Sequence, residues 1–251
     1  MVLCSCCFDR HIGRGNLVYK IQNGADKTTG KVVPGNSKAI LKLGNGRLIS
    51  LSDSVAGIFI ANHVDVKEGE LVYTDQVGEG DEFNELVLPR GGEYRLVLSD
   101  GTSVRLNSGS ILRYPVSFSG KERTVELSGE AFFEVATDSL RPFSVKMTPS
   151  QLADFNPTTN QLEIWTTDLS PYISWVEGRF LFINETLEQI MNTLSLWYDF
   201  EVLFEQEELR QLHFSGSMKR YEQIDRTLDA ISYTVNVSMN WRGKTLIIRK
   251  K

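Results

Sequence analysis

The chain has 251 residues, of which 41% are hydrophobic and 24% charged, and its formal net charge is −5 with a sequence pI of about 5.4. This length is sufficient for one large domain or two smaller domains, each with its own core. A mildly acidic chain without a basic stripe cannot neutralise a phosphate backbone, so the composition argues against a nucleic-acid partner.

The three cysteines, Cys4, Cys6 and Cys7, lie within the first seven residues. The rest of the fold therefore depends on no disulfide and no thiolate-bound metal. With His11 nearby, this leader could be a zinc site or could carry a lipid-modified cysteine, although no second ligand pair follows and no apolar signal region precedes it. We favour a third interpretation, a disordered leader that packs against nothing.

Membrane insertion has no candidate segment in this sequence. No apolar run approaches the roughly 20 residues that a membrane-spanning helix needs. The longest candidate, residues 55–61, predicts a buried strand. A signal peptide is not recognisable either, so we expect a soluble chain without a targeting segment.

Two segments share one hairpin pattern, in which alternating apolar residues flank an Asn-Gly or Asp-Gly turn. Six positions of the first segment recur at a constant offset of 55 residues in the second, which indicates an internal repeat of one supersecondary unit. A chance similarity of two hairpins is the alternative. The offset relates Ala39 to Tyr94, Leu41 to Leu96, Leu43 to Leu98, Gly46 to Gly101, Ile49 to Val104 and Leu51 to Leu106.

Short strands continue between and after these hairpins. We predict strands at residues 71–73, 111–118, 124–127, 131–136 and 143–147. Turn residues separate them at Ser119-Gly120, Ser128-Gly129 and Arg141-Pro142. Many short strands at regular spacing are typical of an antiparallel β sandwich or barrel-like domain, rather than of parallel βαβ units. Residues 148–174 are predicted to be a connector.

The C-terminal segment changes to a mixed pattern, for which we predict the order β-α-β-β-α-β-β. The first helix is expected to follow a strand at 178–182, with Asn184 as its N-cap and apolar residues at helical spacing up to Tyr198. Tyr221, Ile224 and residues further along indicate a second helix. The remaining strands are predicted at 200–204, 212–217, 235–241 and 245–249. We therefore expect a compact α+β domain whose helices cover one face of a small sheet.

Several strings of residues resemble the FecR domain in order and spacing. They are Leu88-Pro89-Arg90-Gly91-Gly92-Glu93-Tyr94, residues 98–107, Ser110-Ile111-Leu112-Arg113-Tyr114-Pro115, residues 127–135 and Pro142-Phe143-Ser144-Val145. The C-terminal part is similar to the family's terminal module, which resembles the secretin/TonB N-terminal (STN-like) fold. That similarity is carried by Trp175, Gly178-Arg179-Phe180, Leu187, Trp197-Tyr198, Phe214-Ser215-Gly216-Ser217 and Leu246-Ile247-Ile248.

The resemblance implies a domain organisation. Residues 1–35 would be a leader, 36–147 a FecR-like β domain, 148–174 a connector and 175–251 an STN-like α+β module. The resemblance also implies further strands after the Pro-Phe-x-Val strand. Here Met147 passes directly to residues that resemble a later part of the family pattern, so we expect the β domain to be shortened and to expose strand edges.

The resemblance implies a function as well. The chain would be the periplasmic part of an anti-sigma regulator that is anchored in the inner membrane. It would sense an outer-membrane TonB-dependent transporter through that transporter's N-terminal signalling domain, and so control an extracytoplasmic-function sigma factor. The cytoplasmic sigma-binding segment and the membrane helix of the family are expected to be missing from this chain.

Eight positions of the strings are predicted to have structural roles: Gly91, Asp100, Gly101, Asn107, Tyr114, Pro115, Gly129 and Glu130. We expect Asp100-Gly101 to form a turn and Asn107 to bond local backbone near the following turn. A direct partner contact at Asp100 or Asn107 is the less favoured alternative.

Partner binding is predicted on a strand edge of the C-terminal module, because small STN-like sheets offer an exposed strand to a partner's backbone. We expect the edge to lie in the hairpin 235–249 or in the strand 212–217, with Phe214→Asp or Ile247→Pro abolishing binding. The candidate residues are Phe214, Ser215, Gly216, Val235, Val237 and Ile247.

The sequence shows no set of residues typical of a catalytic site. We therefore predict neither an enzyme nor a cofactor or metal site. Glu126, Glu130 and Glu134 would share one face of a straight strand, but Gly129 is expected to break that register. The histidines have no partner at metal-ligand spacing, and no nucleophile elbow is present. A carbohydrate-binding or adhesin-like β protein is the alternative function, although such a protein would not need the C-terminal module.

Overall fold

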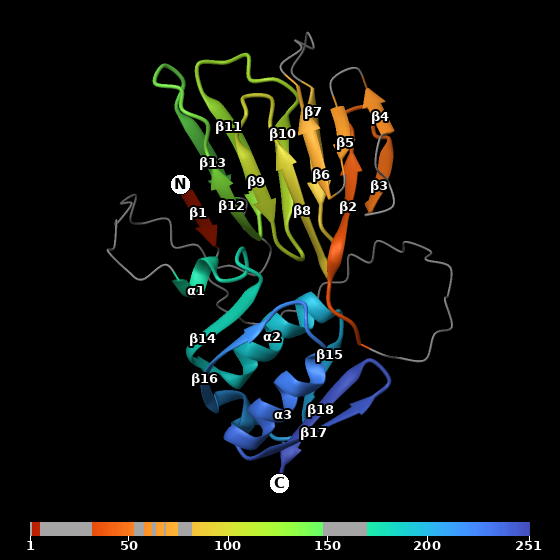
Figure 1. Cartoon of the computed structure of the whole chain (residues 1–251), viewed down its shortest axis with the longest axis vertical. Coiled ribbons are helices and arrows are strands. Elements are labelled where there is room, and N and C mark those ends of the chain that lie inside the picture. The colour runs from red at the N-terminus through yellow and green to blue at the C-terminus, as the bar shows by residue number, and fades with distance from the viewer. Residues whose placement is uncertain are drawn as a thin grey trace.

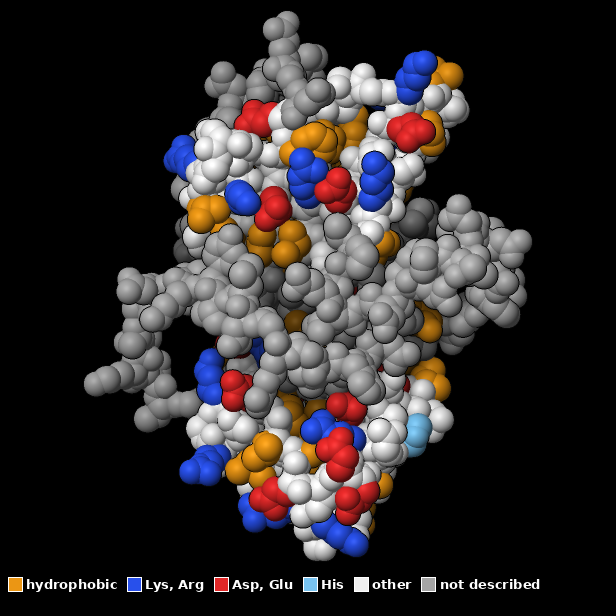
Figure 2. All heavy atoms as spheres, turned by 180° about the vertical axis from the view of Figure 1, so that it is seen from behind, with side chains coloured by type: hydrophobic (Ala, Val, Ile, Leu, Met, Phe, Trp, Pro, Cys, Tyr) orange, Lys and Arg blue, Asp and Glu red, His pale blue; other side chains and the backbone are white. Residues whose placement is uncertain are grey.

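In the computed structural model, two domains are stacked along the long axis (Figure 1). The upper domain consists of β strands, and the lower one combines strands with the helices α2 and α3. The structure describes residues 2–5, 32–52, 58–61, 64–67, 69–74, 82–147 and 170–251. Cys6, Cys7, His11, His63 and most of the predicted connector lie outside the described residues. Acidic and basic side chains are interspersed over both domains on the face shown in Figure 2, without a block of one sign.

The upper domain, hereafter the β domain, is a sandwich of two strand layers. One short parallel pairing joins the layers, in which Asn36–Ser37 of β2 pair with Gly92–Glu93 of β8. The first layer has the order β1 (Val2–Ser5), β12 (Glu130–Glu134), β9 (Ser103–Leu106), β8 (Gly92–Val97), β6 (Glu70–Tyr73), β5 (Val64–Lys67) and β4 (Ile58–Ala61). The second has the order β3 (Leu48–Ser52), β2 (Asn36–Lys42), β7 (Phe83–Val87), β10 (Ile111–Pro115), β11 (Arg123–Ser128) and β13 (Phe143–Met147).

The two hairpins of the predicted internal repeat have the same register. Lys42 pairs with Leu48 in the hairpin β2–β3. In the hairpin β8–β9, Val97 pairs with Ser103, and these two residues lie 55 positions after Lys42 and Leu48. Both turns use the same backbone bond, since Gly46 N donates to the Leu43 carbonyl at 2.8 Å and Gly101 N to the Leu98 carbonyl at 2.9 Å. These glycines have φ values of 84° and 83°, which only glycine adopts without strain.

The leader does not behave as expected. Val2–Ser5 forms strand β1, which pairs antiparallel with β12, Cys4 opposite Ala131. The expectation of a leader that packs against nothing is therefore wrong for these four residues. Without β1, strand β12 would be an edge strand with unpaired backbone groups, and β1 pairs with those groups.

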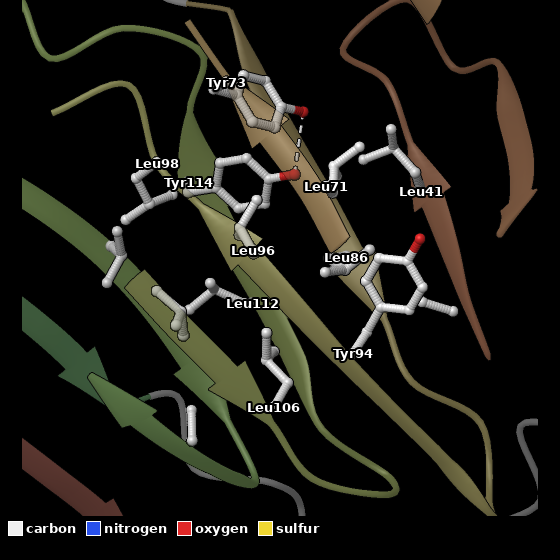
Figure 3. Close-up of a cluster of buried hydrophobic side chains, with 14 of the residues drawn as sticks. Leu41, Leu71, Tyr73, Leu86, Tyr94, Leu96, Leu98, Leu106, Leu112 and Tyr114 are labelled. Atoms are coloured by element: carbon white, nitrogen blue, oxygen red, sulfur yellow. Dashed lines mark hydrogen bonds between the residues drawn. The ribbon is translucent and has the colours of Figure 1, made fainter. Parts of the chain in front are cut away.

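Leucine side chains from both layers meet in the core of the sandwich (Figure 3). Three polar groups are buried beside them: the Tyr73 and Tyr114 hydroxyls are 3.0 Å apart, and the Asn84 amide donates to the Tyr73 hydroxyl at 2.7 Å. Burial raises the pKa of Tyr73 to about 12 and the pKa of Tyr114 well above its ordinary value, so both phenols stay protonated and can donate. The predicted structural residue Tyr114 thus has a packing role.

The lower domain, hereafter the C-terminal module, has the predicted order β-α-β-β-α-β-β. Its elements are β14 (Arg179–Thr186), α2 (Leu187–Tyr198), β15 (Glu201–Phe204), β16 (His213–Lys219), α3 (Ile224–Thr234), β17 (Val237–Arg242) and β18 (Thr245–Lys250). A short helix α1 (Ser170–Ile173) precedes them and a 3-10 turn η1 (Glu207–Gln211) follows β15.

The strands of this module form two sheets rather than the single sheet that was predicted. One sheet pairs β14 with β16, and the other has the order β15-β18-β17. Because α2 and α3 each contact strands of both sheets, the core lies between the two sheets and around the helices. In this module, only β18 has a strand neighbour on both sides among the described residues, so β14, β15, β16 and β17 each have a free edge there.

Two local predictions are corrected. The N-cap of α2 is Thr186 rather than Asn184, because Thr186 and Gln189 form a reciprocal capping box. Asn184 instead lies in the preceding irregular stretch of β14 with a φ of 53°. Tyr221 precedes α3 and does not belong to its apolar face, so its side chain is available for another contact.

Candidate functional site: the interdomain junction

The β domain contacts the C-terminal module first at the end of helix α2. The Arg90 guanidinium donates to the carbonyls of Ser195 at 2.7 Å and Phe200 at 2.6 Å, and lies 3.2 Å from the Asp199 carboxylate. The backbone N–H of Gly91 donates to the Leu196 carbonyl at 2.7 Å. The last carbonyls of a helix have no partner within it and carry partial negative charge, so a cation and an N–H donor from outside stabilise them.

Glycines allow the two domains to approach closely at this point. A Cβ at Gly35 would lie 2.7 Å from the Trp197 ring, and a Cβ at Gly109 would lie 2.8 Å from the Leu196 side chain. Gly91 has a φ of 67°, in the left-handed region that favours glycine. The family-like Arg90-Gly91-Gly92 string therefore has a physical reason: it places backbone against the end of α2.

A buried arginine of the module forms the second part of the junction. Arg220 directly follows β16 and is 1% exposed, with its guanidinium 3.6 Å from the centroid of the Trp197 ring. It donates to the Asn107 side-chain oxygen of the β domain at 2.5 Å and lies 3.6 Å from the Glu93 carboxylate. Burial lowers the pKa of Arg220, and Glu93 partly offsets that effect.

Asn107 connects this arginine to a third group. Its side-chain oxygen also accepts from Ser108 N at 2.8 Å, which confirms the expected local backbone bond. Its amide nitrogen donates to the Glu130 carboxylate at 2.6 Å. Desolvation raises the pKa of Glu130, although the Asn107 bond and the Arg220 charge act in the opposite direction.

Two further bonds cross between the domains. The Tyr221 hydroxyl donates to Glu93 at 2.9 Å, and Arg105 donates to the Val176 carbonyl at 3.2 Å. Burial and the nearby Glu93 carboxylate raise the pKa of Tyr221 to about 12, so the phenol remains a donor at neutral pH. The junction is therefore built mainly from polar and charged side chains of both domains.

The structure brings three of the eight predicted structural residues together here, namely Gly91, Asn107 and Glu130. Gly129 lies beside them: its φ of 101° separates β11 from β12, and a Cβ would clash with Ser110. This break puts Glu126 in the other layer from Glu130 and Glu134, so the three do not form a carboxylate cluster.

Asp100, Gly101, Tyr114 and Pro115 lie elsewhere in the β domain. Asp100 accepts from Thr102 N at 2.9 Å in the expected turn, and it also forms an ion pair with Arg123 at 2.7 Å, which the sequence did not indicate. The side chains of this pair are 5% and 3% exposed. Pro115 ends strand β10.

The predicted partner-binding residues divide between the core and the surface of the module. Phe214 and Val237 are buried in the core, and a Cβ at Gly216 would clash with the Phe214 ring. Phe214→Asp would consequently disturb folding before it tested binding. Ser215 is exposed on β16, whereas Val235 and Ile247 are half-buried. Ile247 lies in the central strand β18, so Ile247→Pro would break a ladder inside the sheet.

Sequence reasoning did not assign a role to Arg90, Glu93 or Arg220. Nothing in the local sequence marks these three residues as functional, because each has the appearance of an ordinary solvent-exposed charge in its own segment. Only the pairing of Arg220 with Asn107, 113 residues away, reveals the site.

The raised pKa of Glu130 leads to a prediction on pH. The stability that Glu130 contributes is fully present below the ordinary pKa of the group, 4.5. It is lost as the pH rises through the raised pKa of Glu130 in the folded protein. We expect Glu130→Gln, which keeps an acceptor for Asn107, to raise the free energy of unfolding at pH 7 and to match the wild type near pH 4. Urea denaturation at both pH values tests this. An equal difference in the free energy of unfolding between variant and wild type at both pH values would contradict this prediction. Glu134→Gln, at an exposed position of β12, is the matched control.

The structure is that of a two-domain protein, in which a β sandwich is joined to a small α+β module by a polar junction. Gly91, Asn107 and Glu130 of the family-like strings lie at this junction. The chain belongs to the FecR family: the family model described as FecR protein matches residues 85–162, and the one described as FecR, C-terminal matches residues 179–248.

Solved structures support the fold. Two crystal structures of a "putative anti-sigma factor" from Parabacteroides distasonis ATCC 8503 are similar to this chain with a TM-score of 0.57 and 20% identity. They cover 66% and 67% of this chain and 99% of their own. Comparison with curated proteins gives no match.

The described residues contain neither a group of metal-ligating side chains nor a membrane-spanning helix. No group of three or more His, Cys, Asp or Glu side chains is arranged to hold a metal ion there. Among the helices that the structure describes, none has the length and apolar character to cross a membrane.

Proposed function

We propose that this chain is the periplasmic signalling part of an anti-sigma regulator, and that it receives its signal from an outer-membrane TonB-dependent transporter. Membership of the FecR family implies regulation of a sigma factor. The finer assignment rests on the family resemblance: the transporter's N-terminal signalling domain would bind here, and an extracytoplasmic-function sigma factor would be controlled through a cytoplasmic segment.

The observation that carries this proposal is that both segments of the C-terminal module predicted to bind the partner contain a strand with a free edge, β16 and β17. Strand β16 pairs only with β14, and β17 only with β18, among the described residues. A partner can add a strand to such an edge, where backbone hydrogen bonds supply affinity and alternate side chains supply specificity. Of the two edges, β16 is favoured because it ends one residue before Arg220 of the junction.

The described residues of the β domain do not favour the glycan-binding alternative. The shallow depression between Lys42, Asn84, Glu85 and Arg113 contains one aromatic residue, Phe83. The Arg113 guanidinium already lies 4.1 Å from the centroid of that ring. A sugar would have to displace this cation to stack there.

Calorimetric titration of the full chain with the signalling domain of the transporter encoded beside it tests the proposal. We expect binding at micromolar concentration or tighter. Ser215→Arg, which places a bulky cation on β16, should weaken binding at least tenfold, and Asn240→Arg on β17 serves as the matched edge control. The opposite ranking would move the partner to β17. Absence of binding by the folded wild-type chain would overturn the proposed function.

A further inference from the structure

The two domains bury separate hydrophobic cores. The cluster in the β domain runs from Ala39 to Phe133, and the cluster in the module runs from Phe180 to Ile248, with no residue in common. Val32, just before β2, packs against the second cluster. Because each domain has its own apolar core, separating them does not require either core to be opened.

The contacts between the domains are instead mainly polar, and not all of the polar groups are paired. Arg220 Nε has no hydrogen-bond acceptor among the described protein groups, since Glu93 is 3.6 Å away. The Glu130 carboxylate is held in a desolvated position that disfavours its charge. Desolvation of buried charges offsets most of the attraction between them, so such an interface closes with a modest net free energy. Opening it would return Arg220, Glu93 and Glu130 to water.

We propose that the interdomain junction is a polar latch, formed by Arg90, Gly91, Asn107, Glu130 and Arg220, that opens while both domains remain folded. In the β domain, the latch residues Arg90, Gly91, Asn107 and Glu130 lie in strings that resemble the family. In the module, their partners are the end of α2 and Arg220. The latch lies next to the favoured partner edge, but its opening is a property of the free chain and does not depend on any partner.

Native-state hydrogen exchange tests the latch directly, because one backbone bond crosses it. Gly91 N–H donates to the Leu196 carbonyl, whereas Leu88 N–H donates to Ser110 within the β domain and Leu187 N–H to Leu212 within the module. We expect Gly91 to exchange at least tenfold faster than Leu88 and Leu187 after correction for intrinsic rates. Equal protection at all three amides would show that the domains separate only on global unfolding, and would overturn the latch.

A second measurement separates domain opening from a local fluctuation at Gly91. In a chain with Cys4, Cys6 and Cys7 replaced by serine, Glu93→Cys and Tyr221→Cys can be joined by a short bismaleimide across the junction. The link should slow Gly91 exchange at least tenfold and leave Leu88 and Leu187 unchanged. If Gly91 exchanged at the same rate in the linked and the unlinked protein, its exchange would be due to local motion, and the proposal would be contradicted. Asn107→Ala, conversely, should accelerate Gly91 alone.

Discussion

Arg220→Ala should lower the free energy of unfolding by about 3 kcal/mol, because it leaves Asn107 and the Glu93 and Glu130 carboxylates without their cation at a desolvated junction. The loss also includes the contact of the guanidinium with the Trp197 ring, 3.6 Å away at its centroid. The effect is large for a single charged side chain because this one is almost fully buried.

Urea denaturation followed by tryptophan fluorescence measures this loss. Arg220→Lys keeps the charge but removes the planar guanidinium, so an intermediate loss is expected. Arg226→Ala, at an exposed position of α3, is the matched control and should change stability by less than about 0.5 kcal/mol. A similarly small effect of Arg220→Ala would show that the junction contributes little to the closed state.

Asp100→Ala should cost about 3–5 kcal/mol, the range for removing one partner of a buried ion pair. Its carboxylate accepts from the Arg123 guanidinium at 2.7 Å and from Thr102, and Arg123 also donates to the carbonyls of Ala136 and Arg141. Without Asp100, a buried cation would keep only neutral partners, and the turn at Gly101 would lose its side-chain acceptor.

Thermal or urea unfolding tests this prediction against a second ion pair of the same domain. Arg113 and Glu126 are 3.1 Å apart, but their side chains are 43% and 35% exposed. Glu126→Ala should therefore cost no more than about 1 kcal/mol. If Asp100→Ala and Glu126→Ala lowered the free energy of unfolding by similar amounts, burial of the Asp100–Arg123 pair would not explain the loss of stability.

The parts of the fold that the sequence predicts well are those with local causes. The hairpin ending at Leu51 and its repeat ending at Leu106 follow from alternation around an Asn-Gly or Asp-Gly turn, and the two hairpins share one register. The helix of residues 187–198 follows from its apolar period, and its true N-cap was readable too, since Thr186 and Gln189 have capping-box spacing.

The parts that escaped prediction depend on distant residues. Nothing local to β14–β16 or β15–β18 indicates that these pairs form separate sheets. Likewise, Gly91, Asn107 and Glu130 were identified only through the family resemblance, and their physical reason appears when Arg220 is placed against them. An exposed-looking arginine after a strand gives no sign that it will be buried by another domain.

The central claim is that Arg220 and Asn107 join the two domains, and a double-mutant cycle tests it most directly. The free energy of unfolding would be measured for the wild type, Arg220→Ala, Asn107→Ala and the double variant. We predict a coupling energy of at least about 1 kcal/mol, as expected for residues in one hydrogen-bonded network. Additivity of the two losses within about 0.3–0.5 kcal/mol would contradict the account, because independent sites behave in that way.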